Sequence, residues 1–270
     1  MPETVAEYAY ETVFVRRRGG ELRIELNRPD TMNAWNRQLG IDLLAAVERG
    51  SRDDDVRAVI ITGAGHGFSS GADLKSGFDL TSGGRPDVGT ALRERYHPII
   101  TGIRRMEKPV LAAVNGPAVG IGFSLALACD LVIAKESAYF LLAFVNIGLV
   151  PDGGSSLFVP ARIGFARAAE LAMLGERLPA ARALEWGLIN RVVTDDTFDE
   201  EVDGLAARLA AGPTRSYAAT KRQLNAMAYP QMDRQLELEA TLQQEMANSD
   251  DFVEGVGAFL AKRPPAFSGR

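Results

Sequence analysis

The chain has 270 residues, of which 46% are hydrophobic and 24% are charged, and these proportions predict a globular protein rather than a disordered one. Its net charge of -5, without a long basic run, argues against a nucleic-acid-binding groove. A single cysteine, Cys129, cannot form an internal disulfide, and no metal-binding donors cluster around it in the sequence. We therefore expect no metal and no redox site, with Cys129 as part of the core.

The first residues resemble neither a targeting segment nor a membrane anchor. The segment 1–7 is acidic and polar where a signal peptide would be basic and apolar, and no apolar run reaches membrane-spanning length. These features predict a cytoplasmic protein that does not contact a membrane.

The first two thirds of the chain show strands that alternate with helices. Alternating runs at 11–17 and 21–26, joined by two glycines, predict a β-hairpin, and a helical pattern follows from about 36 to 49. Short apolar runs at 57–62, 109–114 and 130–134 predict buried strands, and glycine-containing turns follow at 68–74, 115–122 and 148–154. This recurrence predicts an α/β protein with parallel strands.

Two of these turns have the composition of an anion site. The segments 68–74 (FSSGADL) and 115–122 (NGPAVGIG) each lead into a pattern that we interpret as helical. Glycine allows a sharp turn close to a ligand, and the first N–H groups of a helix lack internal partners and carry the positive end of its dipole. The two turns are thus predicted to form halves of one site for a developing oxyanion.

The rest of the chain divides into a connecting loop and a helical region. The polar, glycine-rich segment 76–90 is longer than an ordinary connection and is a candidate lid. From residue 197 onward the pattern is helical, with prolines at 213, 230 and 264 where helices would start or stop. We therefore divide the chain into a core at 1–196 and a helical region at 197–270. The segment 231–246 has an apolar face with no predicted strand left to cover it, which makes it a candidate for packing on another subunit.

Residues 67–71 match the motif Gly-x-Ser-x-Gly, which is typical of the nucleophile turn of serine hydrolases. Serine hydrolases with this motif have their catalytic histidine after the serine and the acid, late in the chain. The two histidines here are His66 and His97, so we reject this class. Neither glycine turn contains a dinucleotide-binding or nucleotide-phosphate motif.

Several motifs in their order along the chain resemble the crotonase family, also called the enoyl-CoA hydratase/isomerase family, with the isomerase-type members closest. These motifs are 27–29 (NRP) with 33–34 (NA), 68–74, 108–122 (KPVLAAVNGPAVGIG), 128–130 (ACD) and 147–154 (IGLVPDGG). The resemblance spans nearly the whole chain. It implies a spiral of ββα units, a C-terminal helical region that supports a homotrimer or a dimer of trimers, and an acyl-CoA thioester as substrate without a further cofactor.

The resemblance also implies roles for individual residues. Ala72 and Ile121 would form the oxyanion hole through their backbone N–H groups. Lys262 would reach CoA from a neighbouring subunit, although a solvated lysine is an equally good interpretation. The remaining positions implied in substrate or CoA binding are Arg28, Ala34, Ser70, Gly71, Asp73, Leu74, Gly120 and Phe144.

The carboxylates distinguish among reactions within the family. The two glutamates of its hydratases would align with Ser124 and Phe144, neither of which can act as a general base at neutral pH. Asp152 remains, at a position where isomerase members use a carboxylate to shuttle a proton. The alternative is that Asp152 caps a helix starting near Ser155.

The leading hypothesis is therefore an enoyl-CoA isomerase acting on an unsaturated or ring-bearing acyl-CoA, with Asp152 as its base. A hydratase that uses Asp152, and a non-catalytic CoA- or RNA-binding member, are the alternatives. Five residues are candidates for an acyl-binding wall, or else for plain core: Trp35, Phe78, Leu80, Phe140 and Phe144. We expect His66 to be an exposed loop residue and Asp130 to orient backbone or pair with an arginine.

Overall fold

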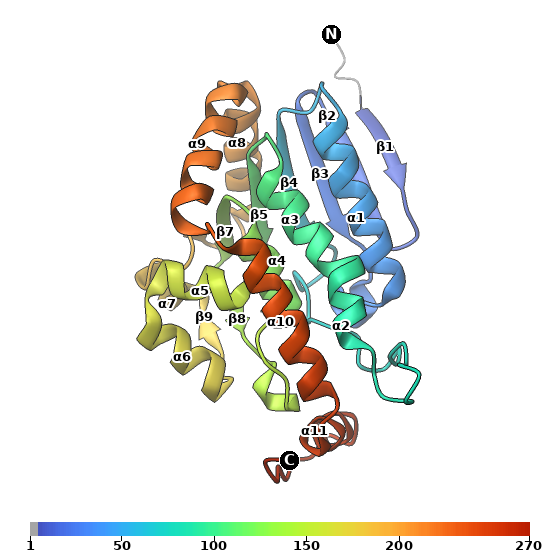
Figure 1. Ribbon diagram of the computed structural model, residues 1–270. Helices are drawn as coiled ribbons and strands as arrows, with labels where there is room; N and C mark the ends of the chain where they lie inside the picture. The colour runs from blue at the N-terminus through green and yellow to red at the C-terminus, as the bar shows by residue number, and fades with distance from the viewer. Residues whose placement is uncertain (1–4) are drawn as a thin grey trace.

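A seven-stranded sheet forms the centre of the protein, in a computed structural model that describes residues 5–270 (Figure 1). Its strands in spatial order are β1 (Val5–Ala9), β2 (Val13–Arg18), β3 (Glu21–Leu26), β4 (Ala58–Gly63), β5 (Val110–Val114), β7 (Leu131–Lys135) and β10 (Arg191–Val193). The first three strands are antiparallel, and from β3 onward all neighbours are parallel. The α/β class with parallel strands is thus confirmed, as is the predicted hairpin of β2 and β3.

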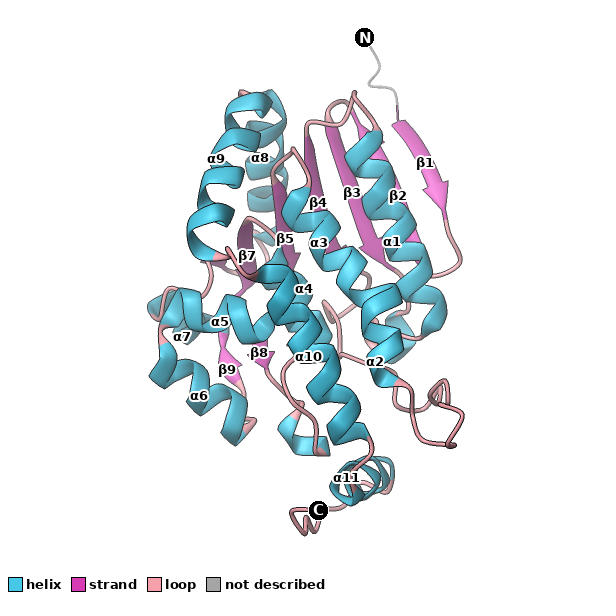
Figure 2. Cartoon of the chain, viewed as in Figure 1, coloured by secondary structure: helices cyan, strands magenta, loops and turns pink. Residues whose placement is uncertain are grey.

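Helices cover both faces of this sheet, which explains the continuous apolar runs of its central strands. Val59 and Ile61 of β4 belong to the core beneath α1 (Arg37–Arg52) and α3 (His97–Arg105). Ile60 belongs to a second core on the other face, where α8 (Phe198–Ala211) supplies Phe198. Figure 2 shows α1 and α3 in front of the magenta strands. Successive side chains of β4 therefore pack into the two hydrophobic cores on opposite faces of the sheet.

Polar side chains define the two ends of α1. The side chain of Asn36 accepts a hydrogen bond from the backbone N of Leu39 at 2.9 Å and so caps the first turn. At the other end, Nζ of Lys108 donates to the carbonyl oxygens of Gly50, at 2.8 Å, and of Asp53, at 2.6 Å. These contacts satisfy carbonyl groups that the end of a helix leaves without partners.

A smaller three-stranded sheet lies below the main one. It contains β6 (Ala118–Val119), β8 (Tyr139–Leu141) and β9 (Leu178–Pro179), strands too short to be predicted from a period. Helices α4 (Ile121–Ala128), α5 (Ser155–Ile163), α6 (Phe165–Leu174) and α7 (Ala180–Glu185) belong to this part of the sequence. Figure 1 shows α5, α6 and α7 grouped around β8 and β9.

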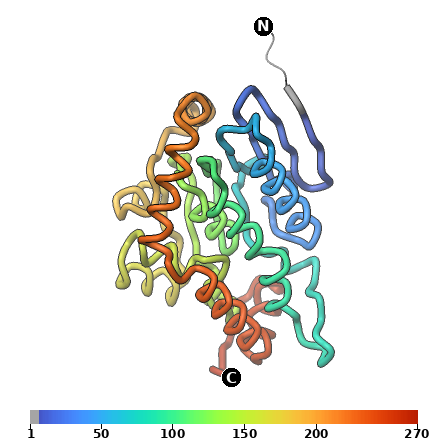
Figure 3. The backbone as a smooth tube through the Cα atoms, turned by 45° about the horizontal axis from the view of Figure 1, so that its top comes forward, coloured from blue at the N-terminus to red at the C-terminus, as the bar shows by residue number. Residues whose placement is uncertain are grey.

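The last part of the chain is helical, as predicted, with α9 (Thr214–Ala228), α10 (Met232–Ala247) and α11 (Asp250–Leu260) after α8. The interpretation that α10 has nothing to cover it within its own chain was wrong. Its buried residues include Leu236 and Ala240, and it packs on α2 (Val88–Ala91) and α5 (Figure 3). Packing of α10 on another subunit stays a prediction.

Within residues 5–270, every helix is too short or too polar to traverse a lipid bilayer.

Candidate active site

The two glycine turns lie side by side because β4 and β5, which they follow, are neighbouring parallel strands. Hydrogen bonds join them directly. The carbonyl oxygen of Pro117 accepts from the backbone N of Ser69 at 3.0 Å, and the backbone N of Val119 donates to the carbonyl oxygen of Ser69 at 2.9 Å. A third segment borders the first turn, since the backbone N of Trp35 donates to the carbonyl oxygen of Gly71 at 2.8 Å. The relative position of the turns is thus fixed by backbone contacts.

Glycine is required where the turns approach one another. Gly71 has φ of +92° and Gly120 has φ of +53°, a region that L side chains rarely adopt. A Cβ atom at Gly71 would lie 3.1 Å from the carbonyl oxygen of Val119 on the other turn. A side chain at this position would therefore both strain the backbone and press on its neighbour.

Two backbone N–H groups are left free by this arrangement. Ala72 and Ile121 border the same cavity, and no protein acceptor pairs with either N–H among residues 5–270. Ile121 is the first residue of α4, where the helix dipole favours negative charge. The first turn differs from the prediction, because Ala72 leads into the loop 75–87 and not into a helix. Ala72 therefore contributes a hydrogen-bond donor but no helix dipole.

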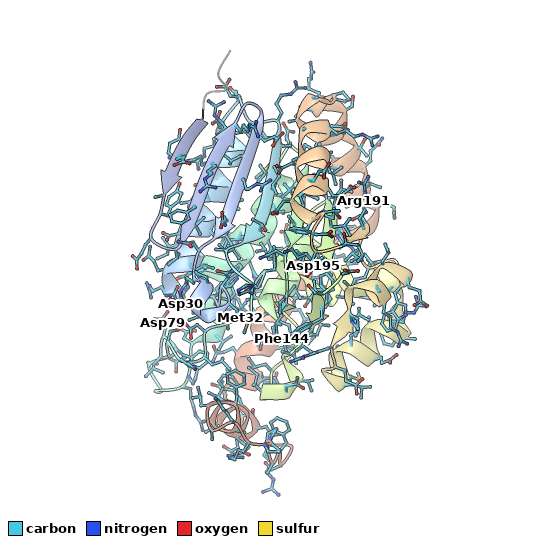
Figure 4. All side chains as sticks on the ribbon, turned by 180° about the vertical axis from the view of Figure 1, so that it is seen from behind. Asp30, Met32, Asp79, Phe144, Arg191 and Asp195 are labelled. Atoms are coloured by element: carbon cyan, nitrogen blue, oxygen red, sulfur yellow. The ribbon has the colours of Figure 1, made fainter. Side chains whose placement is uncertain are left out.

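The cavity next to these N–H groups has a volume of about 810 Å³. Predicted site residues on its wall are Ser70, Gly71, Ala72, Asp73, Leu74, Gly120, Ile121, Phe144 and Asp152. Met32 and Phe144, which are far apart in sequence, both border it, and Figure 4 labels them with Asp79 of the candidate lid, which also reaches its wall. The structure thus brings together nine of the predicted positions, in a cavity large enough for a small organic ligand.

The predicted acyl wall is only partly right. Trp35, Phe78 and Phe144 border the cavity. Leu80 does not, and its exposed fraction is 64%. Phe140 is fully buried in the core, where its ring lies 5.2 Å from that of Phe123. The alternative of plain core is thus correct for Phe140, whereas both interpretations were wrong for Leu80, because apolar composition alone does not distinguish a cavity wall from core or surface.

Three predicted CoA-binding residues lie off the cavity wall. Nη2 of Arg28 forms an ion pair with Asp73 at 2.9 Å, while its Nη1 donates to the carbonyl oxygen of Ala34. Arg28 therefore links Asp73, in the first glycine turn, to the backbone of Ala34. Lys262 is exposed, whereas the next residue, Arg263, borders the cavity and pairs with Glu254. Roles for Arg28, Ala34 and Lys262 in CoA binding stay predictions.

Asp152 is buried at the cavity wall just before α5, and it does not cap that helix. Gly154 occupies the N-cap position and has no side chain with which to cap the helix. Instead, Oδ2 of Asp152 accepts a hydrogen bond from Nε2 of Gln243 at 2.7 Å, and Oδ1 has no partner among the described residues. The capping interpretation of this side chain was therefore wrong.

The surroundings of Asp152 favour its protonated form. Burial raises the pKa of this carboxyl well above its usual range, and the nearby charge of Glu239 raises it further, while the hydrogen bond from Gln243 opposes both effects. Glu239 is itself buried and accepts hydrogen bonds from the backbone N of Gly154 at 2.8 Å and of Ser156 at 3.2 Å. Burial raises the pKa of Glu239 to about 7. Two carboxyl groups that readily hold a proton thus lie here, Asp152 on the cavity wall and Glu239 behind it.

Sequence analysis missed Glu239 and Gln243, although a signal was present. Both residues share the buried face of α10 with Leu236 and Ala240, at helical spacing. Polar side chains on the apolar face of an amphipathic helix need partners in the core. Tyr96 was also missed. It borders the cavity, and burial raises the pKa of its phenol.

The remaining residues that the sequence analysis singled out lie off the cavity wall. Ser124 is fully buried and donates a hydrogen bond from Oγ to the carbonyl oxygen of Asp152 at 2.7 Å. His66 is exposed and Cys129 is fully buried, as expected. Asp130 does both things expected of it, because Oδ2 accepts from the backbone N of Val110 at 2.8 Å and Oδ1 lies 3.2 Å from Nη1 of Arg104.

An α/β fold with free N–H groups and a buried carboxyl on the wall of one cavity is suited to enzymes that stabilise an oxyanion and transfer a proton. The profile described as enoyl-CoA hydratase/isomerase matches residues 16–270, and the chain belongs to this family, the crotonase family.

Its relatives include both hydratases and isomerases. The 1,2-epoxyphenylacetyl-CoA isomerase of Escherichia coli K12 is 41% identical, over 93% of this chain and 96% of its own length. A probable enoyl-CoA hydratase of Rhodobacter capsulatus is 43% identical, over 97% of this chain and its full length. The crystal structure of an enoyl-CoA hydratase from Mycobacterium avium subsp. paratuberculosis superposes with a TM-score of 0.88 at 40% identity, covering 96% of this chain and all of its own.

Proposed function

We propose that this protein is an enoyl-CoA isomerase, in which Asp152 carries a proton from C2 to C4 of a 3-enoyl-CoA. The observation that carries the proposal is the presence of one buried carboxyl group, that of Asp152, on the cavity wall. One oxygen of this carboxyl has no partner among the described residues. The family resemblance aligns Ser124 and Phe144 with the two glutamates of its hydratases, and neither side chain is a carboxylate. A single base suffices for a 1,3 proton shift, because the group that removes the proton can also return it.

The two glycine turns supply the second requirement of this reaction. Removal of the C2 proton places negative charge on the thioester oxygen, and the free N–H groups of Ala72 and Ile121 border the cavity where that oxygen would lie. Both donors are backbone groups and already oriented. Loss of one such donor typically costs about 2.7–4 kcal/mol of transition-state stabilisation.

The raised pKa of Asp152 suits the middle of the reaction. A general acid–base residue works best when its pKa lies near the operating pH, and it typically contributes about 10²–10⁴-fold to the rate. Burial and the charge of Glu239 move Asp152 in that direction from the ordinary range of an aspartate. Its protonated form is therefore easy to reach once the dienolate has formed.

For the substrate we propose an unsaturated or ring-bearing acyl group. The cavity wall includes the aromatic side chains of Trp35, Tyr96 and Phe144, which provide flat apolar surface. The name of the Escherichia coli relative, an isomerase of a phenylacetyl-CoA epoxide, supports a ring. The name of the Rhodobacter capsulatus relative keeps hydration, with Asp152 as base, as the second candidate.

The test is to incubate the protein with 3-enoyl-CoA and with 2-enoyl-CoA, before and after Asp152→Asn. We expect isomerisation of the 3-enoyl-CoA and a loss of about 10²-fold or more in kcat for the variant. Asp79→Asn is the matched control, since Asp79 is another aspartate of the cavity wall and pairs with Arg37 and Arg95 at its edge. Undiminished isomerisation by Asp152→Asn would refute the role of Asp152. Hydration without isomerisation would support the hydratase, and binding without turnover the non-catalytic alternative.

A further inference from the structure

Helix α10 presents two polar side chains to the back of the cavity, Glu239 and Gln243, one helical turn apart. Both are buried, with exposed fractions of 2% and 0%. Polar side chains in such positions lose water and must be compensated by hydrogen bonds. Where those hydrogen bonds go indicates what the side chains do.

The amide of Gln243 can adopt only one orientation. Its Nε2 donates to the carbonyl oxygen of Val150 at 2.8 Å and to Oδ2 of Asp152 at 2.7 Å. A carbonyl oxygen only accepts, so turning the amide over would place Oε1 against two acceptors. Val150 therefore fixes the orientation of the amide, and the amide then always offers an N–H to Oδ2 of Asp152.

This contact makes the two oxygens of Asp152 unequal. Oδ2 receives the N–H of Gln243, while Oδ1 is buried without a partner in the described part of the chain. The backbone of Asp152 is held as well, because its carbonyl oxygen accepts from Oγ of Ser124 at 2.7 Å and from Oγ of Ser155 at 2.8 Å. We therefore expect an added proton at Oδ1, because protonation of Oδ2 would weaken its hydrogen bond from Gln243, whereas Oδ1 has no donor to lose.

We propose that Gln243 is a positioning residue of the reaction, which holds Asp152 through Oδ2 so that Oδ1 alone takes the proton from C2 and returns it to C4. This inference rests on the proposed function. In the first step the C2–H bond breaks, its electron pair enters the dienolate, and an O–H bond forms at Oδ1. In the second step that O–H bond breaks and a C4–H bond forms from the dienolate electrons, which leaves the double bond between C2 and C3. No oxidant or further reactant is needed.

The hydrogen bond from Gln243 also stabilises the ionised form of Asp152, against burial and the charge of Glu239. Its removal should therefore make the carboxylate a rarer species at neutral pH. A hydrogen bond to a charged group contributes roughly 1.5–3 kcal/mol, which corresponds to a loss of roughly tenfold or more in the population of the active base.

The experiment compares Gln243→Met, which keeps the length of the side chain without its donors, with Gln244→Met on the same helix. Gln244 is a matched control, because it also makes two contacts between α10 and another segment: Nε2 donates to the carbonyl oxygen of Pro86 and Oε1 accepts from the backbone N of Gly89, both at 3.0 Å. It does not contact Asp152.

Two readouts separate positioning from general support of the fold. The first is the carboxyl ¹³C titration of Asp152 in aspartate-labelled protein, with the signal assigned by its loss in Asp152→Asn. The second is the pH profile of kcat with 3-enoyl-CoA. For Gln243→Met we expect a higher pKa of Asp152, a kcat reduced roughly tenfold or more at neutral pH, and KM within about twofold of the native value. For Gln244→Met we expect an unchanged titration.

An unchanged titration and kcat in Gln243→Met would overturn the inference, and so would an equal effect of both variants on the titration. If the native protein isomerises no 3-enoyl-CoA, the proposed function fails, while the titration still decides whether Gln243 holds Asp152. Should Gln243→Met not fold, Gln243→Glu retains the length and a polar end. Its ionised form would repel Asp152, so we expect a lower kcat as the pH rises, and a native profile would contradict the inference.

Discussion

Replacement of Glu239 by glutamine should change how the stability of the protein depends on pH. The carboxyl of Glu239 is buried behind the cavity, and burial raises its pKa from an ordinary 4.5 to about 7. In the unfolded chain the group is solvated and titrates near its ordinary value. Between these two pKa values the folded protein retains a proton that the unfolded chain has released.

The sign and size of the effect follow from proton linkage. Because the folded state binds more protons in this range, the free energy of unfolding falls as the pH rises from 4.5 to about 7 and then levels off. Each unit of difference in pKa corresponds to about 1.4 kcal/mol, so the loss amounts to about 3 kcal/mol for Glu239. Glutamine cannot ionise, and Glu239→Gln should lack this loss. Its altered hydrogen bonds to Gly154 and Ser156 would shift stability at every pH without changing the slope.

Urea unfolding between pH 4.5 and 8 measures this difference. The free-energy gap between native protein and Glu239→Gln should change by about 3 kcal/mol across the range, in favour of the variant at high pH. Loss of the Glu239 charge also lowers the pKa of Asp152, which acts in the same direction. His97, whose pKa burial lowers to about 4, destabilises both proteins equally in acid and cancels in the comparison.

Glu245→Gln provides the control, because Glu245 lies on the same helix with its side chain exposed. This variant should follow the native pH dependence. Parallel curves for native protein and Glu239→Gln would refute the reasoning, since they would mean that Glu239 titrates alike in the folded and unfolded states.

Two further substitutions test the parts that position the site. Gly71→Ala should lower kcat roughly 100- to 1,000-fold in the 3-enoyl-CoA assay, because a Cβ there would lie 3.1 Å from the carbonyl oxygen of Val119 and displace the adjacent N–H of Ala72. Gly77→Ala, which has a similar positive φ but nothing within 4 Å of the new Cβ, should lose much less, and equal losses would point to backbone strain alone. Lys108→Met should reduce the free energy of urea unfolding by about 2 kcal/mol, because it strands buried carbonyl groups at the end of α1; a change below about 0.5 kcal/mol would show that water replaces the ammonium group.

Local features of the sequence predicted five strands of the main sheet, which are β2, β3, β4, β5 and β7, together with both glycine turns. A continuous apolar run is typical of a strand buried on both faces, as β4 and β5 are, and a glycine at a positive φ is a local requirement of the turn. The helix expected after Leu74 does not exist, because the polar segment 75–87 has too little apolar surface to dock against the core. The sequence pattern indicated a helix after the first glycine turn, but not that the helix begins only at Val88.

Contacts between distant segments were beyond such reasoning. Gln243 reaches Asp152 across 91 positions in the sequence, and Glu239 reaches Gly154 across 85. Nothing in the residues near Asp152 indicates which helix will cover it, because that depends on how the whole chain packs. The same limit explains the wrong placement of Leu80 and the two interpretations left open for Phe140, for which the side-chain type was known and the surroundings were not.

The late position of α10 in the chain sets an order for the assembly of the site. A nascent chain synthesised and folded as far as β10 already contains both glycine turns and Asp152, but neither Glu239 nor Gln243. Such an intermediate could hold a thioester oxygen, while its carboxyl would lack the donor that orients it. Under the proposed function, docking of α10 is then the step that completes the proton-transfer site after the acyl-CoA site has formed.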